Sequence, residues 1–420
     1  GLLLPFRRGL EKVMEGLEAP ILPVALEGVW GSPFSFRRCR FEAKWPRRLR
    51  QPVTIVFGRP LPSNATAFQV RQAVQESWAE AWRWRFRRVR PISRWFLSTA
   101  RRHPRRLAMA DEQRGGLRFG RVLVGSILIA RRLRAHWRHQ ERVGVLLPPC
   151  VPGALVHWAV VLAGKVPVHL NYTLNSEMLA SCVQQAGLKF VISSEKFLQR
   201  VPVQLPVPVL CLESLLARVG GWEKLVALMA AWTLPGPVLE RWLGGPPAIG
   251  ATHSPARRMA TLVFSSGSTG EPKGAVLTPE NILANIHQVA QVVHFDTRDR
   301  LLGILPFFHS FGFTVGLTLP GVLGLSVIFH PNPLEARAIG ELVRRWQITL
   351  LVATPTFLQL YLRTVPPGDF QSLRLVIAGA EKLPARLAQS FADHFGVAPL
   401  EGYGCTECGP VVSVNVPDFQ

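Results

Sequence analysis

The sequence is short of cysteine, tyrosine and acidic side chains. Only six cysteines occur in 420 residues, at positions 39, 150, 182, 211, 405 and 408. They are too few and too scattered for the disulfide framework of a small secreted protein, so a reducing compartment is expected. Apolar residues make up 48% of the chain and charged residues 18%. This composition excludes a disordered polypeptide and allows two or three domains with sizeable cores.

The shortage of acid leaves a strongly basic protein. Asp and Glu number 27 against 49 Lys and Arg, which gives a formal net charge of +22. Such an excess favours polyanionic partners, such as lipid headgroups, nucleic acid or phosphorylated ligands, and says nothing about the fold. The change in composition is sharpest in residues 83–106, which hold ten arginines, no acid and several aromatic side chains. We interpret this segment as a linker between domains.

One stretch without formal charge, residues 311–329, approaches the length that a bilayer requires. Pro320 and four glycines interrupt it, and its last residues form a short β-like run. The sequence therefore predicts a buried helix, a turn and a strand here rather than a membrane span.

Short apolar runs and helical segments alternate along most of the chain. Residues 1–81 predict a small α/β piece with strands near 21–26 and 53–57 and a helix over 67–81. Further β-like runs occupy residues 143–147, 190–192, 207–210, 261–264, 301–305, 348–352 and 373–378. Strands that alternate with helices predict mainly parallel sheets with covered faces. Residues 234–252, rich in Gly and Pro, are interpreted as an inserted loop.

A helix start is legible at Thr278, which suits the N-cap, with Pro279 in the first turn. The segment before it is therefore predicted to be a strand-to-helix loop. That segment contains Ser265, Ser266, Gly267, Ser268, Thr269, Gly270, Glu271, Pro272, Lys273 and Gly274. Glycines let backbone N–H groups approach a phosphate, hydroxyls donate to its oxygens and a lysine supplies positive charge. Pro272 rules out a Walker A loop, and composition alone also allows a flexible Ser/Gly turn.

The order of residues in this loop resembles the phosphate loop of the adenylate-forming superfamily of acyl- and aryl-activating enzymes. Further segments in the same order are similar to that superfamily's other motifs. They are residues 305–312 (LPFFHSFG), 353–356 (ATPT), 379–381 (GAE) and 403–407 (YGCTE). The resemblance covers roughly residues 95–420, and it implies an enzyme that uses ATP and Mg²⁺.

The resemblance also assigns roles to residues. It implies that the segment from Ser265 to Lys273 holds the β- and γ-phosphates, that Ser265 and Glu407 position Mg²⁺, and that Lys273 acts in catalysis. The nucleotide would be contacted by Gly379, Ala380, Glu381, Tyr403, Gly404 and Thr406. The resemblance also implies that His309 lines the route of the acid or the thiol and, with Lys273, takes part in catalysis. By itself, however, a histidine among phenylalanines is more often a packed core residue.

Residues 1–80 resemble, less specifically, the second half of a lysophospholipid acyltransferase domain, through residues 5–9, 21–31 and 53–62. An acyltransferase ahead of an acyl-activating domain is similar to bifunctional bacterial acyl-[acyl-carrier-protein] synthetase/2-acylglycerophosphoethanolamine acyltransferases. The expected fold is α/β: an acyltransferase remnant over 1–82, the basic linker over 83–106, and the large adenylate-forming domain over 107–420. That domain is expected to consist of stacked mixed and parallel sheets with covering helices.

This resemblance implies that the protein activates a fatty acid, loads it onto acyl carrier protein or coenzyme A, and passes it to a lysophospholipid. It would then act as a peripheral protein on the cytoplasmic side of the bacterial inner membrane. The basic segment would meet an anionic membrane surface, where each Lys or Arg contributes about 1 kcal/mol, or would be an ordinary solvated linker. Alternatives are an acyl-CoA synthetase, a peptide-synthetase adenylation domain or a basic nucleic-acid-binding protein. Nucleic acid is not an expected partner, because no nucleic-acid motif accompanies the basic clusters and the Ser/Gly loop would be unexplained.

Several features depart from the resemblance or mimic other sites. The superfamily's ribose-binding Asp, hinge and lid lysine, and the acyltransferase's H-x4-D pair, are not found, so we interpret the sequence as an internal segment with both active sites incomplete. Cys405 and Cys408 form a single CxxC, which is weak for zinc without a second pair. His294 and Asp299 match H-x4-D, but they fall inside the adenylating region and are discarded as an acyltransferase pair.

Overall fold

The computed structural model describes residues 6–28, 36–37, 40–41, 53–86, 90–137, 140–245, 258–266 and 271–415. The chain divides into two compact units, Gly1–Val89 and Arg90–Gln420. Each unit is considered by itself.

The first unit is a small α/β piece. Its elements are α1 (Gly9–Met14), β1 (Val24–Glu27), β2 (Phe36–Arg37), β3 (Arg40–Phe41), β4 (Thr54–Phe57) and α2 (Ala67–Phe86). β1 and β4 pair antiparallel and α2 packs on both. The Trp78 indole donates to the Leu26 carbonyl over 2.8 Å, and Ile21, Ala65 and Val70 form a small core. The predicted strands and helix are confirmed.

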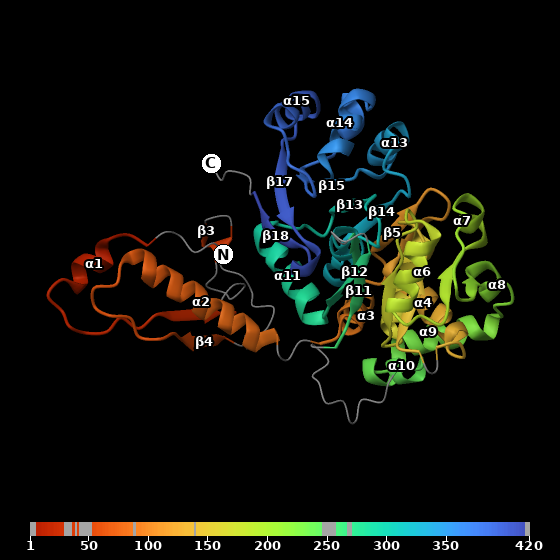
Figure 1. The fold of residues 1–420 in the computed structure, drawn as a ribbon, viewed down its shortest axis with the longest axis horizontal. Coiled ribbons are helices and arrows are strands. Elements are labelled where there is room, and N and C mark those ends of the chain that lie inside the picture. The colour runs from red at the N-terminus through yellow and green to blue at the C-terminus, as the bar shows by residue number, and fades with distance from the viewer. Residues whose placement is uncertain are drawn as a thin grey trace. The chain divides into compact units, whose positions relative to one another are not determined.

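A mixed eight-stranded sheet forms the centre of the second unit (Figure 1). Its strands are, in spatial order, β18 (Val411–Val414), β17 (Pro399–Gly404), β16 (Leu375–Ala378), β15 (Leu350–Ala353), β13 (Arg300–Gly303), β14 (Ser326–Phe329), β5 (Leu107–Asp111) and β6 (Gly115–Arg118). The six inner strands pair parallel, and only the two edge pairs, β18 with β17 and β5 with β6, are antiparallel. The parallel pairing agrees with the alternation of strands and helices in the sequence.

A second sheet of four parallel strands has the order β10 (Val209–Cys211), β9 (Val191–Ser193), β7 (Arg142–Val145) and β8 (Val166–His169). Beside β8 lies a two-stranded hairpin of β11 (Thr261–Ser266) and β12 (Pro272–Leu277). The Thr261 hydroxyl, which is fully buried, donates to the Pro167 carbonyl over 2.7 Å. This bond fixes the start of the hairpin on the edge of the four-stranded sheet.

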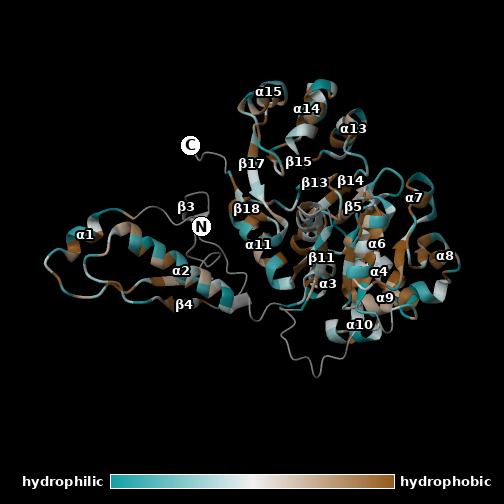
Figure 2. Cartoon of the chain, in the orientation of Figure 1, coloured by the Kyte–Doolittle hydropathy of each residue, from teal (hydrophilic) through white to brown (hydrophobic). Residues whose placement is uncertain are grey.

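Helices cover both sheets. They are α3 (Ile92–Arg102), α4 (Phe119–Leu133), α5 (Val151–Leu162), α6 (Ser176–Gln185), α7 (Glu195–Arg200), α8 (Leu212–Leu216), α9 (Gly221–Thr233), α10 (Gly236–Trp242), α11 (Pro279–Val292), α12 (Leu319–Leu323), α13 (Ala336–Trp346), α14 (Pro355–Thr364) and α15 (Ala385–Phe395). Figure 1 shows α13, α14 and α15 together, and their apolar faces share one core with the eight-stranded sheet. α5 contacts strands of both sheets. Figure 2 shows the apolar colour concentrated on the central strands and on α4.

The uncharged segment 311–329 folds inside the second unit, as predicted. It forms a π-helical segment, η2 (Gly312–Thr318), then α12, a left-handed turn at Gly324 and the buried strand β14. Among the described helices, none combines the length and the apolar character needed to cross a bilayer.

Two segments differ from the interpretation of the sequence. α3 lies within the stretch expected to be a linker, and it buries Phe96 and Leu97 against the second unit. α10 lies within the expected inserted loop and buries Leu239. In both helices, one or two apolar residues per turn form the buried face. The many Arg, Gly and Pro residues around them make this helical spacing of apolar residues hard to detect in the sequence.

Aromatic and imidazole rings fill the interior around α5. Trp158 stacks on Phe96 with ring centroids 4.0 Å apart. His157 and His169 are both buried, with the Nδ1 of His157 3.2 Å from the Nε2 of His169. Burial lowers the pKa of His157 well below its usual range and lowers that of His169 to about 3, so both rings are neutral at pH 7.

Substitution of Gly321 by alanine should destabilise the second unit. A Cβ atom at Gly321 would lie 2.1 Å from the Cζ2 atom of Trp158, which is 1% exposed and cannot move aside freely. Overpacking of this kind costs about 1–3 kcal/mol. The midpoint of thermal unfolding, followed by circular dichroism, should therefore fall.

Gly316→Ala is the matched control, because a Cβ atom there meets no atom within 4 Å. It should leave the midpoint unchanged or raise it slightly, since alanine reduces the freedom of the unfolded chain. Equal midpoints for the two variants would contradict the packing described for α12.

Candidate active site

Four of the segments singled out in the sequence follow parallel strands of the eight-stranded sheet. Residues 305–312 follow β13, Thr354 follows β15, Gly379 follows β16 and Thr406 follows β17. These four strands run in one direction, so their carboxyl ends meet at the same edge of the sheet. In open α/β sheets, ligands bind beyond this edge.

The Ser/Gly segment has a different local structure from the predicted one. Ser265 and Ser266 end β11, and they pair with Lys273 and Pro272 of β12. The prediction of a strand-to-helix loop is therefore wrong: the segment is the turn of a β-hairpin, and β12 separates it from the helix. Gly267, Ser268, Thr269 and Gly270 lie outside the described residues. β12 begins with Pro-Lys-Gly, three residues that are uncommon in strands, so the sequence did not predict a strand between the turn and the helix.

The predicted N-cap at Thr278 is confirmed. Its hydroxyl accepts from the Asn281 amide over 3.2 Å, and the Asn281 side chain accepts from the Thr278 amide over 2.9 Å. This reciprocal capping starts α11 immediately after β12. The hairpin is therefore held at its open end, where Thr261 of β11 bonds to Pro167 of β8 and Leu277 of β12 leads into α11.

Ser265 and Lys273 form the base of the hairpin turn. The Ser265 hydroxyl donates to the Lys273 carbonyl over 3.4 Å, and the Lys273 residue is exposed. Within the described residues the Lys273 ammonium forms no ion pair. The hairpin thus presents a positive charge that the rest of the described chain does not neutralise.

The hairpin meets the last of the motifs. β12 contacts the 3-10 turn η4 (Thr406–Cys408), on which Thr406 and the exposed Glu407 lie. The Thr406 hydroxyl is 3.2 Å from the Ser310 hydroxyl of the segment after β13. Thr314 donates to the Gly409 carbonyl over 3.3 Å. Three segments far apart in the sequence are therefore fastened side by side.

The turn at residues 379–381 joins the same edge. The Glu381 carboxylate accepts from the hydroxyl of Thr356 over 2.7 Å and from its amide over 3.3 Å. Ala380 has a left-handed backbone with φ of 70°. At Gly379, a Cβ atom would lie 3.1 Å from the Phe311 ring and 3.3 Å from a backbone oxygen of β17. The turn is therefore held in place, and a side chain at its first residue would be tightly packed against Phe311 and β17.

Tyr403 and Gly404 of the last motif have different surroundings. Tyr403 is 65% exposed at the end of β17. Gly404 faces the chain that returns to β18, where a Cβ atom would lie 2.3 Å from the Pro410 carbonyl oxygen. A side chain at this position would push β17 and β18 apart. Tyr403 and Thr406 thus flank a glycine that the close approach of the two strands requires.

His309 is exposed, whereas Phe307 and Phe308 beside it are buried. The sequence left two alternatives for His309: a packed core residue, or a residue that lines the path of the acid or the thiol. Its exposure favours the second alternative. Crowding by neighbouring atoms, including the Phe308 ring at 4.6 Å between centroids, removes water from the imidazole and lowers the pKa of His309. The ring is neutral at pH 7.

The predicted magnesium ligands, Ser265 and Glu407, offer hard oxygen donors: Ser265 lies on β11, and Glu407 lies on η4, which contacts the partner strand β12. Among the described residues, no group of three or more His, Cys, Asp and Glu side chains could hold a metal. Mg²⁺ commonly takes one or two protein oxygens and completes its shell with water and substrate phosphates. A hydroxyl and a carboxylate therefore fit this ion when it arrives with a nucleotide.

The structure also brings in residues to which the sequence assigned no role. Ser310 and Thr356 lie inside motifs but were not singled out. Asn285 was missed altogether: its amide donates to the Val411 carbonyl over 2.7 Å and its oxygen accepts from the Val411 amide over 3.1 Å. It binds α11 to β18. A polar residue on the apolar face of a predicted helix was the available signal.

The discarded H-x4-D residues are structural. Asp299 accepts from the Arg374 guanidinium and, over 2.8 Å, from the Thr349 hydroxyl, and Arg374 also donates to the His294 carbonyl. Burial would raise the pKa of Asp299, but the bonds from Arg374 and Thr349 lower it overall. The carboxylate thus holds strand ends together.

Comparison with known proteins agrees with this geometry. The long-chain-fatty-acid–CoA ligase of Bacillus subtilis is 26% identical over 327 residues, which are 71% of this chain and 57% of that protein. The 4-hydroxybenzoate–CoA/benzoate–CoA ligase of Rhodopseudomonas palustris is 26% identical over 331 residues, 74% of this chain and 56% of that protein. The chain thus spans little more than half the length of these curated relatives.

A solved structure shows the same fold. The o-succinylbenzoate coenzyme A synthetase of Bacillus subtilis in complex with AMP superposes with a TM-score of 0.62 over 77% of each chain, at 22% identity. The predicted α/β adenylate-forming fold of the second unit is therefore confirmed. The sequence signature of the AMP-binding enzyme family matches residues 96–420. With that match, and with its motifs gathered at one edge of the sheet, the chain belongs to the AMP-binding enzyme family.

Proposed function

We propose that this chain carries the nucleotide and acid site of a ligase that activates a carboxylic acid with ATP and transfers the acyl group to coenzyme A. One observation carries the proposal: the hairpin that bears Lys273 contacts the turn that bears Glu407. Within the described residues the Lys273 charge has no ion-pair partner, and the turn that its hairpin contacts carries a carboxylate and a hydroxyl. This combination suits a polyphosphate that arrives with a divalent cation.

The chemistry that such a site must support has two steps. A carboxylate oxygen attacks the α-phosphorus of ATP, the bond to pyrophosphate breaks, and a mixed anhydride of acid and AMP forms. A thiolate then attacks the acyl carbon, and AMP leaves with the bonding electron pair. The first step moves negative charge onto pyrophosphate, so donors aimed at that group lower the barrier.

Lys273 and the hydroxyl of Ser265 are proposed to hold the phosphate groups that leave. Glu407, with Ser265, is proposed to bind Mg²⁺, whose charge offsets the charge that develops on the phosphates. Thr406 is fixed by Ser310 and is proposed to contact the nucleotide at the α-phosphate side. These residues lie on the hairpin and on η4, which contact each other.

The turn of Gly379, Ala380 and Glu381 is proposed to lie against the adenine, with Tyr403 nearby. Because Thr356 binds the Glu381 carboxylate, this turn is in place before a nucleotide arrives. His309, neutral and exposed, is proposed to line the entry of the acid or the thiol. A neutral imidazole there avoids trapping the carboxylate in an ion pair.

A fatty acid is the proposed substrate class, and coenzyme A is favoured over acyl carrier protein as the thiol. The relatives named for fatty acids and for benzoates are coenzyme A ligases, which supports the thiol more directly than the acid. Acyl carrier protein remains the alternative acceptor.

A second candidate function concerns the first unit. Residues 1–80 resemble part of a lysophospholipid acyltransferase, and they fold as a unit of their own. We propose on this basis that the intact protein also passes an acyl group to a lysophospholipid. This role would place the protein on the cytoplasmic side of the inner membrane as a peripheral protein.

Lys273→Ala in the intact protein should lower the acid-dependent exchange of pyrophosphate into ATP by at least about tenfold. The reason is the loss of a charge-assisted phosphate contact, which is worth about 1.5–3 kcal/mol. Initial rates at saturating acid, with radiolabelled pyrophosphate, give the measurement. Lys196→Ala, at an exposed lysine of α7, is the control and should exchange at the parent rate. Exchange unaffected by Lys273→Ala would remove this residue from the site.

Ser310→Ala and Thr406→Val should each raise the KM for ATP, and their effects should not add. Both remove the same 3.2 Å contact, so the double variant should show a coupling energy of about 0.5–1.5 kcal/mol. A double-mutant cycle on kcat/KM for ATP measures it.

A cycle that pairs Ser310→Ala with Thr364→Val on α14 is the control and should be additive. Additivity in the first cycle as well would mean that Ser310 does not position Thr406.

A further inference from the structure

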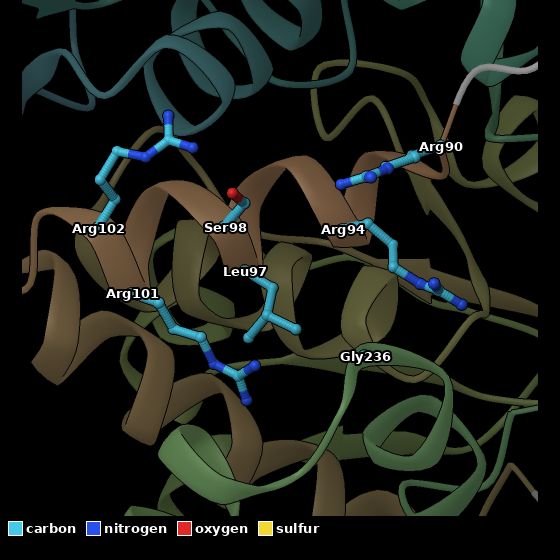
Figure 3. Close-up of a pocket in the computed structure, with 7 residues that line it drawn as sticks. All are labelled: Arg90, Arg94, Leu97, Ser98, Arg101, Arg102 and Gly236. Atoms are coloured by element: carbon cyan, nitrogen blue, oxygen red, sulfur yellow. The ribbon is translucent and has the colours of Figure 1, made fainter. Parts of the chain in front are cut away.

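A pocket of about 610 Å³ opens between α3 and the start of α10, on elements that the proposed active site does not use. It is lined by Arg90, Arg94, Leu97, Ser98, Arg101, Arg102 and Gly236. Figure 3 shows Arg94, Leu97 and Arg101 projecting from α3 toward the segment at Gly236, with Arg90 and Arg102 at the two ends of the helix. Four of its seven lining residues are arginines.

The spacing of α3 produces this concentration of charge. Arg94 and Arg101 are seven residues apart, so they share one side of the helix. The helix contains no acidic residue that would alternate with them. Like charges on one helix face repel each other and destabilise the fold. This repulsion has to be offset by other contacts of the arginines, with the protein or with a ligand.

Two of the arginines are partly held by the protein. Arg101 donates to the Ala231 carbonyl over 2.7 Å and to the Leu234 carbonyl over 2.6 Å, so it closes the end of α9. Arg94 approaches Gly236, where a Cβ atom would lie 2.9 Å from its Cδ atom. Burial raises the pKa of Glu240 on α10, and the positive charges of Arg94 and Arg258 partly offset this increase. The Glu240 carboxylate, when ionised, therefore neutralises part of the positive charge of the pocket.

The remaining donors lack partners within the described chain. The Nε atom of Arg94 is shielded from water and makes no hydrogen bond there. Arg90 and Arg102 are exposed, and no described carboxylate forms an ion pair with any of the four guanidinium groups. The described chain therefore leaves most of the positive charge of the pocket without a partner, which points to an anionic ligand.

We propose that this pocket binds an organic phosphate, with the phosphate oxygens held by Arg102 and the hydroxyl of Ser98, which Figure 3 shows on the side of α3 away from Gly236, and by Arg90 at the end of the helix. Arg94, on the other side of α3, adds positive charge to the pocket. Guanidinium groups present paired N–H donors that match phosphate oxygens and remain charged at any physiological pH. The pocket is larger than a single phosphate ion needs and lies in the size range of small-molecule sites, so the organic part of the ligand has room. Leu97 offers that part an apolar contact.

The headgroup of a phospholipid and a soluble phosphate ester share this chemistry, and two binding measurements separate them. The first is sedimentation of the intact protein with phosphatidylcholine vesicles that contain phosphatidylglycerol, compared with phosphatidylcholine alone. The second is calorimetric titration with glycerol 3-phosphate. Binding in either measurement, at 0.15 M salt, is the expected result. Neither depends on adenylation activity, so failure of the proposed function and failure of this site are distinguishable.

Arg90→Gln/Arg102→Gln should weaken the observed binding by at least about tenfold, since charge-assisted contacts to phosphate are among the strongest hydrogen bonds. Both residues are exposed, so the variant should fold. Arg105→Gln/Arg118→Gln removes the same charge from exposed residues outside the pocket and should bind as the parent does.

Three results would overturn the site. One is no binding to the vesicles or to glycerol 3-phosphate. Another is equal weakening in the two double variants, which would show attraction to net charge alone. The third is binding of a duplex oligonucleotide, with neither phosphate probe bound, that is lost in Arg90→Gln/Arg102→Gln.

Discussion

Parallel pairing of β13, β15, β16 and β17 is the constraint on which the candidate site depends. Parallel strands must return through a helix on one face, so every strand delivers its carboxyl end, and the segment that follows it, to the same edge. Burial of both faces of the sheet keeps the strands in register. Ser310, Glu381 and Thr406 are thereby placed on neighbouring segments before any of their own contacts form.

The fold was largely predictable because its signals are local. Most strands coincide with the expected apolar runs, Thr278 caps α11 as expected, and residues 311–329 form buried structure because glycines and a proline interrupt them. In the second unit, the strands β5, β6, β8, β12, β17 and β18 and the helices α3 and α10 were not recognised. For β12, α3 and α10 the apolar residues are few, and their positions depend on neighbours that are distant in sequence, such as β8 for the hairpin.

The candidate site was predictable as a set of segments but not as a set of contacts. Resemblance identified the turn at Gly379 and the residues around Thr406. It did not indicate that Ser310 reaches Thr406, that Thr356 holds Glu381, or that Asn285 joins α11 to β18. These are hydrogen bonds between segments 25 to 126 residues apart. Side-chain periodicity cannot reveal them, because each depends on the register of a complete sheet.

The neutral pair His157 and His169 carries a consequence for acid tolerance. Both imidazoles have folded-state pKa values below 6.5, because burial penalises their charged forms. Well above pH 6.5 the folded and unfolded chains carry the same charge on these rings. As the pH falls through 6.5, the two imidazoles bind protons in the unfolded chain but not in the folded one. The free energy of unfolding therefore decreases as the pH falls. The junction of α5 with β8 therefore acts as a proton-sensitive weak point, independent of any carboxylate.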